Sequence, residues 1–338
     1  LEEIVPKIGR WIIPTLETSD GEILQDSTEI IDHFESKGLA RRSAYPTTPR
    51  QLAVAHVLEL YGAEGLLRPA MHYRWNFPEI NDGFIEMNFV DGVGGGVPPE
   101  QAREAARQGM KRMRLAAAAF GVSPETIPVI EASYLELLEL LQAHLMEAPY
   151  LLGGRPSLAD YGLIAPLYAH LSRDPHPSQL MKQRAHRVWR WTERMNSRTD
   201  EPGGVLDGSE DLFANDEIPD TLKAVLRHAA EDLVPETQAA ARFIDEWLEA
   251  QGDIEEGAVL ERGVGQCRFE LPGTTINALA QPYRIFLLQR LQDACAAMPS
   301  GDRQKAQELL EEVGLGPLLQ IRTRRRVERA NHREVLGA

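Results

Sequence analysis

The sequence predicts a mainly α-helical protein with a small α/β part near its N-terminus. A strand, a turn, a second strand and a helix follow one another between residues 10 and 36. Apolar residues then recur at helical spacing through most of residues 51–197 and 221–314. With 338 residues, the chain is long enough for two domains and a sizeable core.

The α/β part is predicted from short apolar runs separated by turn residues. One strand is expected over residues 10–18 and a second over Glu22–Leu24, with the hairpin-turn sequence Ser19-Asp20-Gly21 between them. Asp26 and Ser27 then supply the side chains that favour a helix N-cap. A helix is therefore expected to begin directly after the second strand.

The central part of the chain is predicted to form a set of helices after a proline-containing linker at residues 40–49. Residues 78–99, with three consecutive glycines at 94–96, are expected to be a loop-rich connection without a phosphate-loop signature. Helices are expected at residues 51–67, 101–120, 128–145, 157–172 and 184–195.

Residues 200–216 are rich in acidic residues and glycine, and they indicate a boundary. Beyond it we expect a helix over 221–249, a small hairpin over 263–280 and two further helices. We therefore divide the chain into residues 1–40, 48–200 and 205–338. Five arginines between residues 322 and 329 are expected on a C-terminal helix, paired with acidic neighbours; a basic nucleic-acid-binding arm is the alternative.

Composition disfavours several classes of partner. The net charge of −15 repels nucleic acid and anionic lipid. No apolar run is long enough to span a bilayer, and the first residues lack the pattern of a signal peptide. Cys267 and Cys295 are too few and too far apart for a disulfide framework, which favours the cytoplasm; both are expected to be buried. No spacing of His, Cys or Asp indicates a metal site.

Two short motifs stand out. The first joins Ile13-Pro14 to Asp26-Ser27, at the point where a strand gives way to a helix. Helix N-terminal amides favour a carboxylate ligand, and Asp26 can pair with an ammonium group, so this corner suits the end of an α-amino acid. The alternative is a purely structural role, in which Asp26 and Ser27 only cap the helix. The second motif, Ser157-Leu158-Ala159-Asp160, is a capping box with a structural role.

In this order, these motifs resemble the cytosolic glutathione transferase family over about residues 5–197. Members of that family carry a Val-Pro strand, a Glu-Ser-x-Ala-Ile strand–helix junction and a Ser-x-x-Asp capping box. The resemblance implies a partial thioredoxin-like domain, an all-helical transferase domain and a helical extension. Asp26 stands where the family has Glu, and this sequence contains no candidate for the Tyr, Ser or Cys that activates the thiol.

The resemblance also implies ligands and partners. Glutathione would bind at Ile13, Pro14, Asp26 and Ser27 as a co-substrate, without a metal. Its thiolate would attack a small hydrophobic electrophile. A homodimer is implied as well. The electrophile would lie against the first helix of the helical domain, near Tyr61, Leu67, Met71, His72, Tyr73 and Trp75.

Other interpretations stay open. Tyr73 and Trp75 are alternatively packing residues, and Arg74 a salt-bridge partner. Besides an enzyme, the chain fits a non-catalytic, transferase-like module for binding or assembly. A purely structural helical protein is the third possibility.

Overall fold

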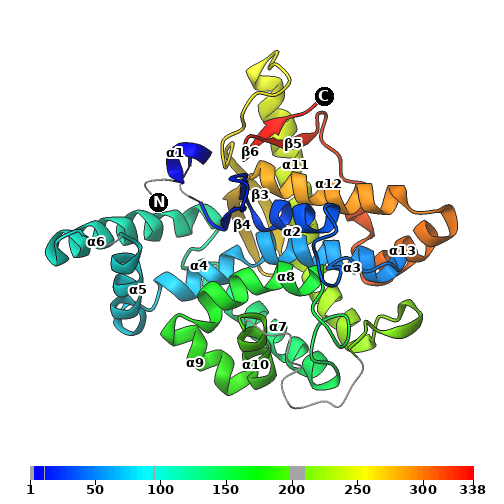
Figure 1. Ribbon diagram of the computed structural model, residues 1–338, viewed down its shortest axis with the longest axis horizontal. Coiled ribbons are helices and arrows are strands. Elements are labelled where there is room, and N and C mark those ends of the chain that lie inside the picture. The colour runs from blue at the N-terminus through cyan, green and yellow to red at the C-terminus, as the bar shows by residue number, and fades with distance from the viewer. Residues whose placement is uncertain (1–3, 11, 94–95, 198–209) are drawn as a thin grey trace.

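The computed structural model describes residues 4–10, 12–93, 96–197 and 210–338. The protein is mainly α-helical, as predicted, and the strands of the described residues form two-stranded antiparallel hairpins. Figure 1 shows α3 and α8 running through the middle of the molecule, while α5 and α6 project to one side. The C-terminal hairpin lies at one end, beside α11 and α12.

The N-terminal part contains a short helix that the sequence analysis missed. Pro6 lies in its first turn, and Gly9 ends it with a left-handed φ of 71°. The first strand begins at Thr15 rather than at residue 10, and Trp11 lies outside the described residues. The elements are α1 (Val5–Ile8), β1 (Thr15–Glu17), β2 (Ile23–Gln25) and α2 (Ser27–Ser36).

The central part is a bundle of helices. The elements are α3 (Pro49–Leu60), the π-helix η1 (Tyr61–Gly65), α4 (Leu67–Trp75), α5 (Pro78–Val93), α6 (Pro99–Ala116), η2 (Ala117–Phe120), α7 (Ile127–Glu147), α8 (Leu158–Pro166), η3 (Leu167–Ser172), α9 (Pro175–Arg184) and α10 (His186–Met195). α3 is buried on nearly all sides, with nine of its residues inaccessible.

The expectation of a loop over residues 78–99 was wrong, because residues 78–93 form α5. Two tertiary contacts hold this helix. The side chain of Asn81 donates to the backbone oxygens of Tyr73 and Arg74, and Ile85 is completely buried. Contacts with neighbouring elements thus outweigh the weak local helix signal of a glycine-containing segment.

The C-terminal part of the chain folds back against α2 and α3. Its elements are η4 (Ala214–Asp216), α11 (Asp220–Gln251), β3 (Gln266–Leu271), β4 (Thr274–Leu279), α12 (Pro282–Ala297), α13 (Ser300–Glu312), η5 (Gly316–Leu319), β5 (Val327–Ala330) and β6 (Arg333–Leu336). β3 and β4 form the hairpin expected at residues 263–280.

The arginines near the C-terminus lie in a loop and a hairpin, not on the expected helix. They are engaged by the protein itself. Arg324 pairs with Glu249, and Arg326 pairs with Asp293. Arg329 is almost fully buried and reaches α2. This arrangement does not leave a free basic arm.

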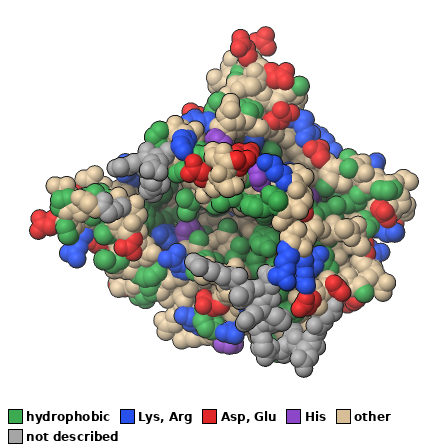
Figure 2. Space-filling model, in the orientation of Figure 1, with side chains coloured by type: hydrophobic (Ala, Val, Ile, Leu, Met, Phe, Trp, Pro, Cys, Tyr) green, Lys and Arg blue, Asp and Glu red, His purple; other side chains and the backbone are tan. Residues whose placement is uncertain are grey.

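One continuous core joins the central and C-terminal parts, since Leu58 and Leu163 belong to the same buried cluster as Leu226 and Leu288. On the face shown in Figure 2, apolar side chains gather near the centre and charged side chains of both signs occupy the outer lobes. Within the described residues, no helix combines the length and apolarity required to cross a bilayer.

Candidate functional site

The structure brings the two halves of the predicted ligand-binding corner together. β1 and β2 pair so that the backbone N–H of Asp26 donates to the carbonyl oxygen of Pro14, over 3.1 Å. The Ile13–Pro14 peptide bond is cis. Ile13 is 80% exposed, and Pro14 and Ser27 are exposed as well. The corner therefore leaves Ile13, Pro14 and Ser27 accessible to solvent.

Asp26 is partly engaged by the protein. Its Oδ1 accepts hydrogen bonds from the backbone N–H and the hydroxyl of Thr28, at 2.9 and 2.8 Å. The Tyr283 hydroxyl, from the start of α12, donates to the same oxygen over 2.9 Å. Burial and the carboxylate of Asp26 raise the pKa of Tyr283, so the phenol stays a donor at neutral pH. Among the described residues, Oδ2 of Asp26 has no hydrogen-bond partner.

The C-terminal hairpin contacts this corner. The Arg329 guanidinium donates to Glu29 over 2.7 Å and to the side chain of Gln25 over 2.8 Å. Arg10 donates to the same Gln25 oxygen and to Glu334. Tyr283 and Arg329 carry no local sequence signal for this role, because they lie about 250–300 residues away from the corner along the chain.

The corner can hold a group that carries both charges. Asp26 offers one free carboxylate oxygen for an ammonium. The first turn of α2 leaves N–H groups without partners inside the helix, and the exposed Ser27 hydroxyl lies beside them. Asp26 is also the N-cap of α2, as the alternative interpretation predicts.

Of the six residues predicted to contact the electrophile, Tyr61 alone lines the cavity beside α7. Trp75 belongs to a separate apolar cluster with Ile85. His72 is buried and its Nε2 lies 3.0 Å from Glu131. The ring of Tyr73 stacks on Phe77 and His176. Leu67 and Met71 are half-buried. Arg74 pairs with Asp174 over 2.9 Å, which confirms the salt-bridge alternative.

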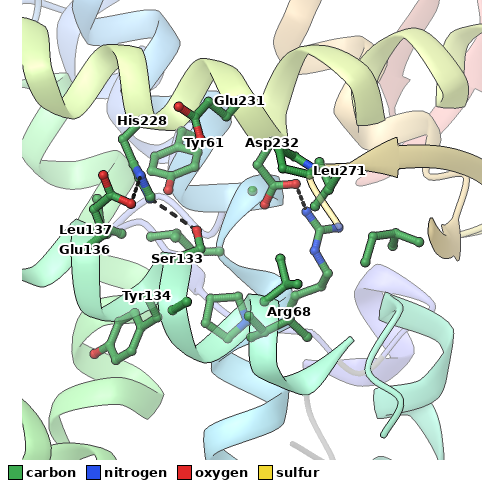
Figure 3. A pocket seen from close by; sticks show the side chains of 18 residues that line it. Tyr61, Arg68, Ser133, Tyr134, Glu136, Leu137, His228, Glu231, Asp232 and Leu271 are labelled. Carbon is green, nitrogen blue, oxygen red and sulfur yellow. Dashed lines mark hydrogen bonds and ion pairs between the residues drawn. The ribbon is translucent and has the colours of Figure 1, made fainter. Parts of the chain in front are cut away.

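The cavity beside Tyr61 has a volume of about 180 Å³. It lies between η1, α7, α11 and the β3–β4 hairpin (Figure 3). Its apolar walls include Leu137, Leu271 and Ile276. None of the four corner residues lines it, so the cavity and the corner are separate places on the molecule.

Polar side chains line this cavity from three helices, α4, α7 and α11. His228 of α11 lies 3.2 Å from the Ser133 hydroxyl of α7, and Asp232 accepts a hydrogen bond from Arg68 (Figure 3). The spacings Ser133–Glu136 and His228–Asp232 place each pair on one helix face, which the sequence does reveal. That these two faces meet depends on how α7 packs against α11.

Buried charges connect this cavity to α12. Arg68 pairs with Glu236 over 3.0 Å, and Glu236 pairs with Arg284 over 2.9 Å. Glu64, in η1, lies beside Arg284 and accepts a hydrogen bond from Gln281. Burial raises the pKa of Glu64 to about 7, although Arg284 opposes this shift.

Glu64→Gln should change how stability depends on pH. The folded-state pKa of Glu64 lies above its unfolded value, so the folded protein binds more protons between about pH 4.5 and 7. The contribution of Glu64 to the free energy of unfolding is therefore present at low pH and is lost as pH rises through 7. The wild-type minus variant difference should fall by roughly 1–3 kcal/mol across this window.

Urea unfolding at several pH values measures this difference. Glu139→Gln, on an exposed part of α7, is the control for removing a carboxylate from the surface. A Glu64→Gln difference that stays constant or grows between pH 4.5 and 7.5 would contradict the prediction.

The second predicted motif forms a capping box at the start of α8. Asp160 is completely buried, and its Oδ2 accepts hydrogen bonds from the backbone N–H and the hydroxyl of Ser157, at 2.9 and 3.0 Å. Its role is structural, because its Oδ1 also accepts hydrogen bonds from Leu151 and Trp191.

Neither cysteine supplies a reactive thiolate. Cys267 and Cys295 are free and buried, as expected, and burial raises the pKa of each thiol to about 11. Within the part of the chain that the structure describes, no group of three or more His, Cys, Asp or Glu side chains is arranged to hold a metal ion.

Comparison with known proteins gave one match. Residues 100–194 match the family model described as the glutathione S-transferase C-terminal domain. This range covers α6 to α10 apart from the first residue of α6 and the last residue of α10, and it includes the capping box at Ser157. Searches of the curated proteins and of the solved structures gave no significant match.

Proposed function

We propose that this chain, which the match of residues 100–194 identifies as a member of the glutathione S-transferase family, binds glutathione at the corner of Ile13, Pro14, Asp26 and Ser27. The observation that carries the proposal is the pairing of Pro14 with Asp26, which aligns two family-like motifs beside an exposed helix N-terminus. The γ-glutamyl ammonium would pair with Oδ2 of Asp26. The adjacent carboxylate would bind at Ser27 and the first amides of α2.

We further propose that the bound thiolate attacks a small hydrophobic electrophile. In that step the sulfur forms a bond to the electrophilic carbon, the leaving group departs with its electron pair, and the thiol proton goes to solvent. The cysteinyl backbone would pair with the main chain at Ile13. Tyr61, Leu67, Met71, His72, Tyr73 and Trp75 remain the predicted electrophile contacts, although they face different surroundings in the structure.

Asp26→Asn should weaken glutathione binding about 10- to 100-fold, measured by calorimetry on the full chain. The amide keeps an oxygen for Thr28 and Tyr283, and asparagine has nearly the size and shape of the aspartate that already adopts the φ of 94° here, so the fold should persist. Only the charge that pairs with the ammonium is lost.

Asp20→Asn is the matched control, since it removes the same charge from the exposed turn of the same hairpin. Its affinity should equal that of the unmodified protein. Equal affinities for all three proteins would reject the site, and no measurable binding by any of them would favour the purely structural alternative.

The non-catalytic alternative is tested separately. A chain that binds glutathione but does not conjugate it to 1-chloro-2,4-dinitrobenzene above the uncatalysed rate would be a binding or assembly module. A homodimer and a cytoplasmic location, both implied by the family, complete the proposal. Sedimentation velocity at several protein concentrations tests the dimer.

A further inference from the structure

The cavity between α7, α11 and the β3–β4 hairpin has the features of a second small-molecule site. It combines apolar walls with a few convergent polar groups, as ligand pockets usually do. Tyr61 and Gly65 line it from the π-helix η1, and π-helical turns inside helices occur frequently at functional sites. Its volume of about 180 Å³ exceeds that of an engineered cavity of about 150 Å³ that holds benzene.

His228 is the polar group in this cavity whose bonding is incomplete. It is only 6% exposed, and its Nε2 lies 3.2 Å from the Ser133 hydroxyl. Its Nδ1 is buried without a hydrogen-bond partner, although Glu136 Oε2 lies 3.7 Å away. Buried ring nitrogens are normally satisfied, so Nδ1 indicates a place for a ligand atom.

The charges that line the cavity are unbalanced. Arg68 is the one arginine in the lining, and its guanidinium is already bound by Asp232 and Glu236. Three carboxylates line the same cavity, from Glu136, Glu231 and Asp232. The carboxylates therefore outnumber the guanidinium, and this excess of negative charge favours a cation over an anion.

We propose that this cavity binds a compact organic amine, with one ring or a short apolar chain attached to a primary ammonium group. The apolar part would pack against Leu137, Leu271 and Ile276. An ammonium has three N–H donors and no acceptor, so it can donate to both Nδ1 of His228 and the carboxylate of Glu136. The amine site does not depend on the glutathione corner, which shares no residue with it.

Three probes of nearly equal size test the charge preference. Benzylamine, benzyl alcohol and benzoate are titrated into the full chain, and binding is followed by calorimetry and by protein amide NMR shifts. We expect benzylamine to bind about 10-fold more tightly than benzyl alcohol, and benzoate to bind least. Shifts should be centred on residues 129–137 and 228–232.

Glu136→Gln should weaken benzylamine binding about 3- to 10-fold and leave benzyl alcohol unchanged, because only the charge is removed. Glu139→Gln is the control. It removes the same charge from the same helix, but Glu139 lies outside the cavity lining and pairs with Arg184. A second variant, Ala132→Phe, places a ring at the exposed rim of the cavity and should reduce binding of both probes.

Several results would overturn the proposal. These are the absence of benzylamine binding, equal or tighter binding of benzoate, and equal effects of Glu136→Gln and Glu139→Gln. The Asp26→Asn variant distinguishes failure of this proposal from failure of the proposed function. It should leave benzylamine binding unchanged even if glutathione binding fails, so the two proposals are tested independently.

Discussion

Replacing Asp160 by alanine is expected to lower the free energy of unfolding by about 3–5 kcal/mol. The carboxylate is fully buried and accepts four hydrogen bonds. Oδ1 accepts from the backbone N–H of Leu151 at 3.0 Å and from the indole N–H of Trp191 at 2.9 Å. Oδ2 accepts both bonds from Ser157. Alanine would leave all four donors buried and without a partner.

Chemical denaturation followed by circular dichroism measures this loss. The control is Asp220→Ala, because Asp220 also lies in the first turn of a helix but its side chain is 98% exposed. That substitution should cost less than about 1 kcal/mol. If Asp160→Ala does not fold, Ser157→Ala, which removes one hydroxyl, should still cost about 1 kcal/mol. Equal losses for Asp160 and Asp220 would show that the buried contacts contribute little.

Gly162→Ala should destabilise the protein by about 3 kcal/mol or prevent folding. At this position α8 crosses α3 so closely that an added Cβ would lie 2.4 Å from the Cα of Glu59. The opposite glycine is equally restricted, since a Cβ on Gly62 would lie 2.1 Å from the carbonyl oxygen of Gly162. Backbone atoms cannot rotate away as a flexible side chain can, so the two helices would have to separate.

Gly83→Ala is the matched control for this substitution. Gly83 lies within α5, and a Cβ there would meet no atom within 4 Å. Alanine favours the helix over glycine, so this change should stabilise the protein by about 0.5–1 kcal/mol. Thermal unfolding of the two variants should therefore shift in opposite directions. A Gly162→Ala variant as stable as Gly83→Ala would show that the crossing is less close than the structure indicates.

Local sequence patterns predicted part of the corner around Asp26. The turn at Ser19-Asp20-Gly21 and the cap at Asp26 were recognisable because both depend on neighbouring residues. The pairing of Pro14 with Asp26 followed from the strand register. The contact from Tyr283 was not predictable, because no local pattern specifies which distant helix packs against α2.

The helical part shows the same difference between local patterns, which the sequence reveals, and long-range contacts, which it does not. Arg68 lies in an apolar stretch before Pro69, and its partners Asp232 and Glu236 lie on α11, far away in the sequence. Likewise, α5 had a weak local signal and forms because Asn81 and Ile85 find partners on other elements. The predicted pocket residues share α4 and η1, but helical rotation points them in different directions.

By itself, the sequence determined the mainly helical fold, the hairpin and cap around Asp26, and the capping box of Ser157 and Asp160. Each depends on period, turn chemistry or capping, which act over a few residues. Only the tertiary structure decided that Tyr283 and Arg329 support the corner, and that His228 meets Ser133 in a cavity. These contacts join residues far apart in the chain, and the packing of whole helices, rather than any local preference, brings them together.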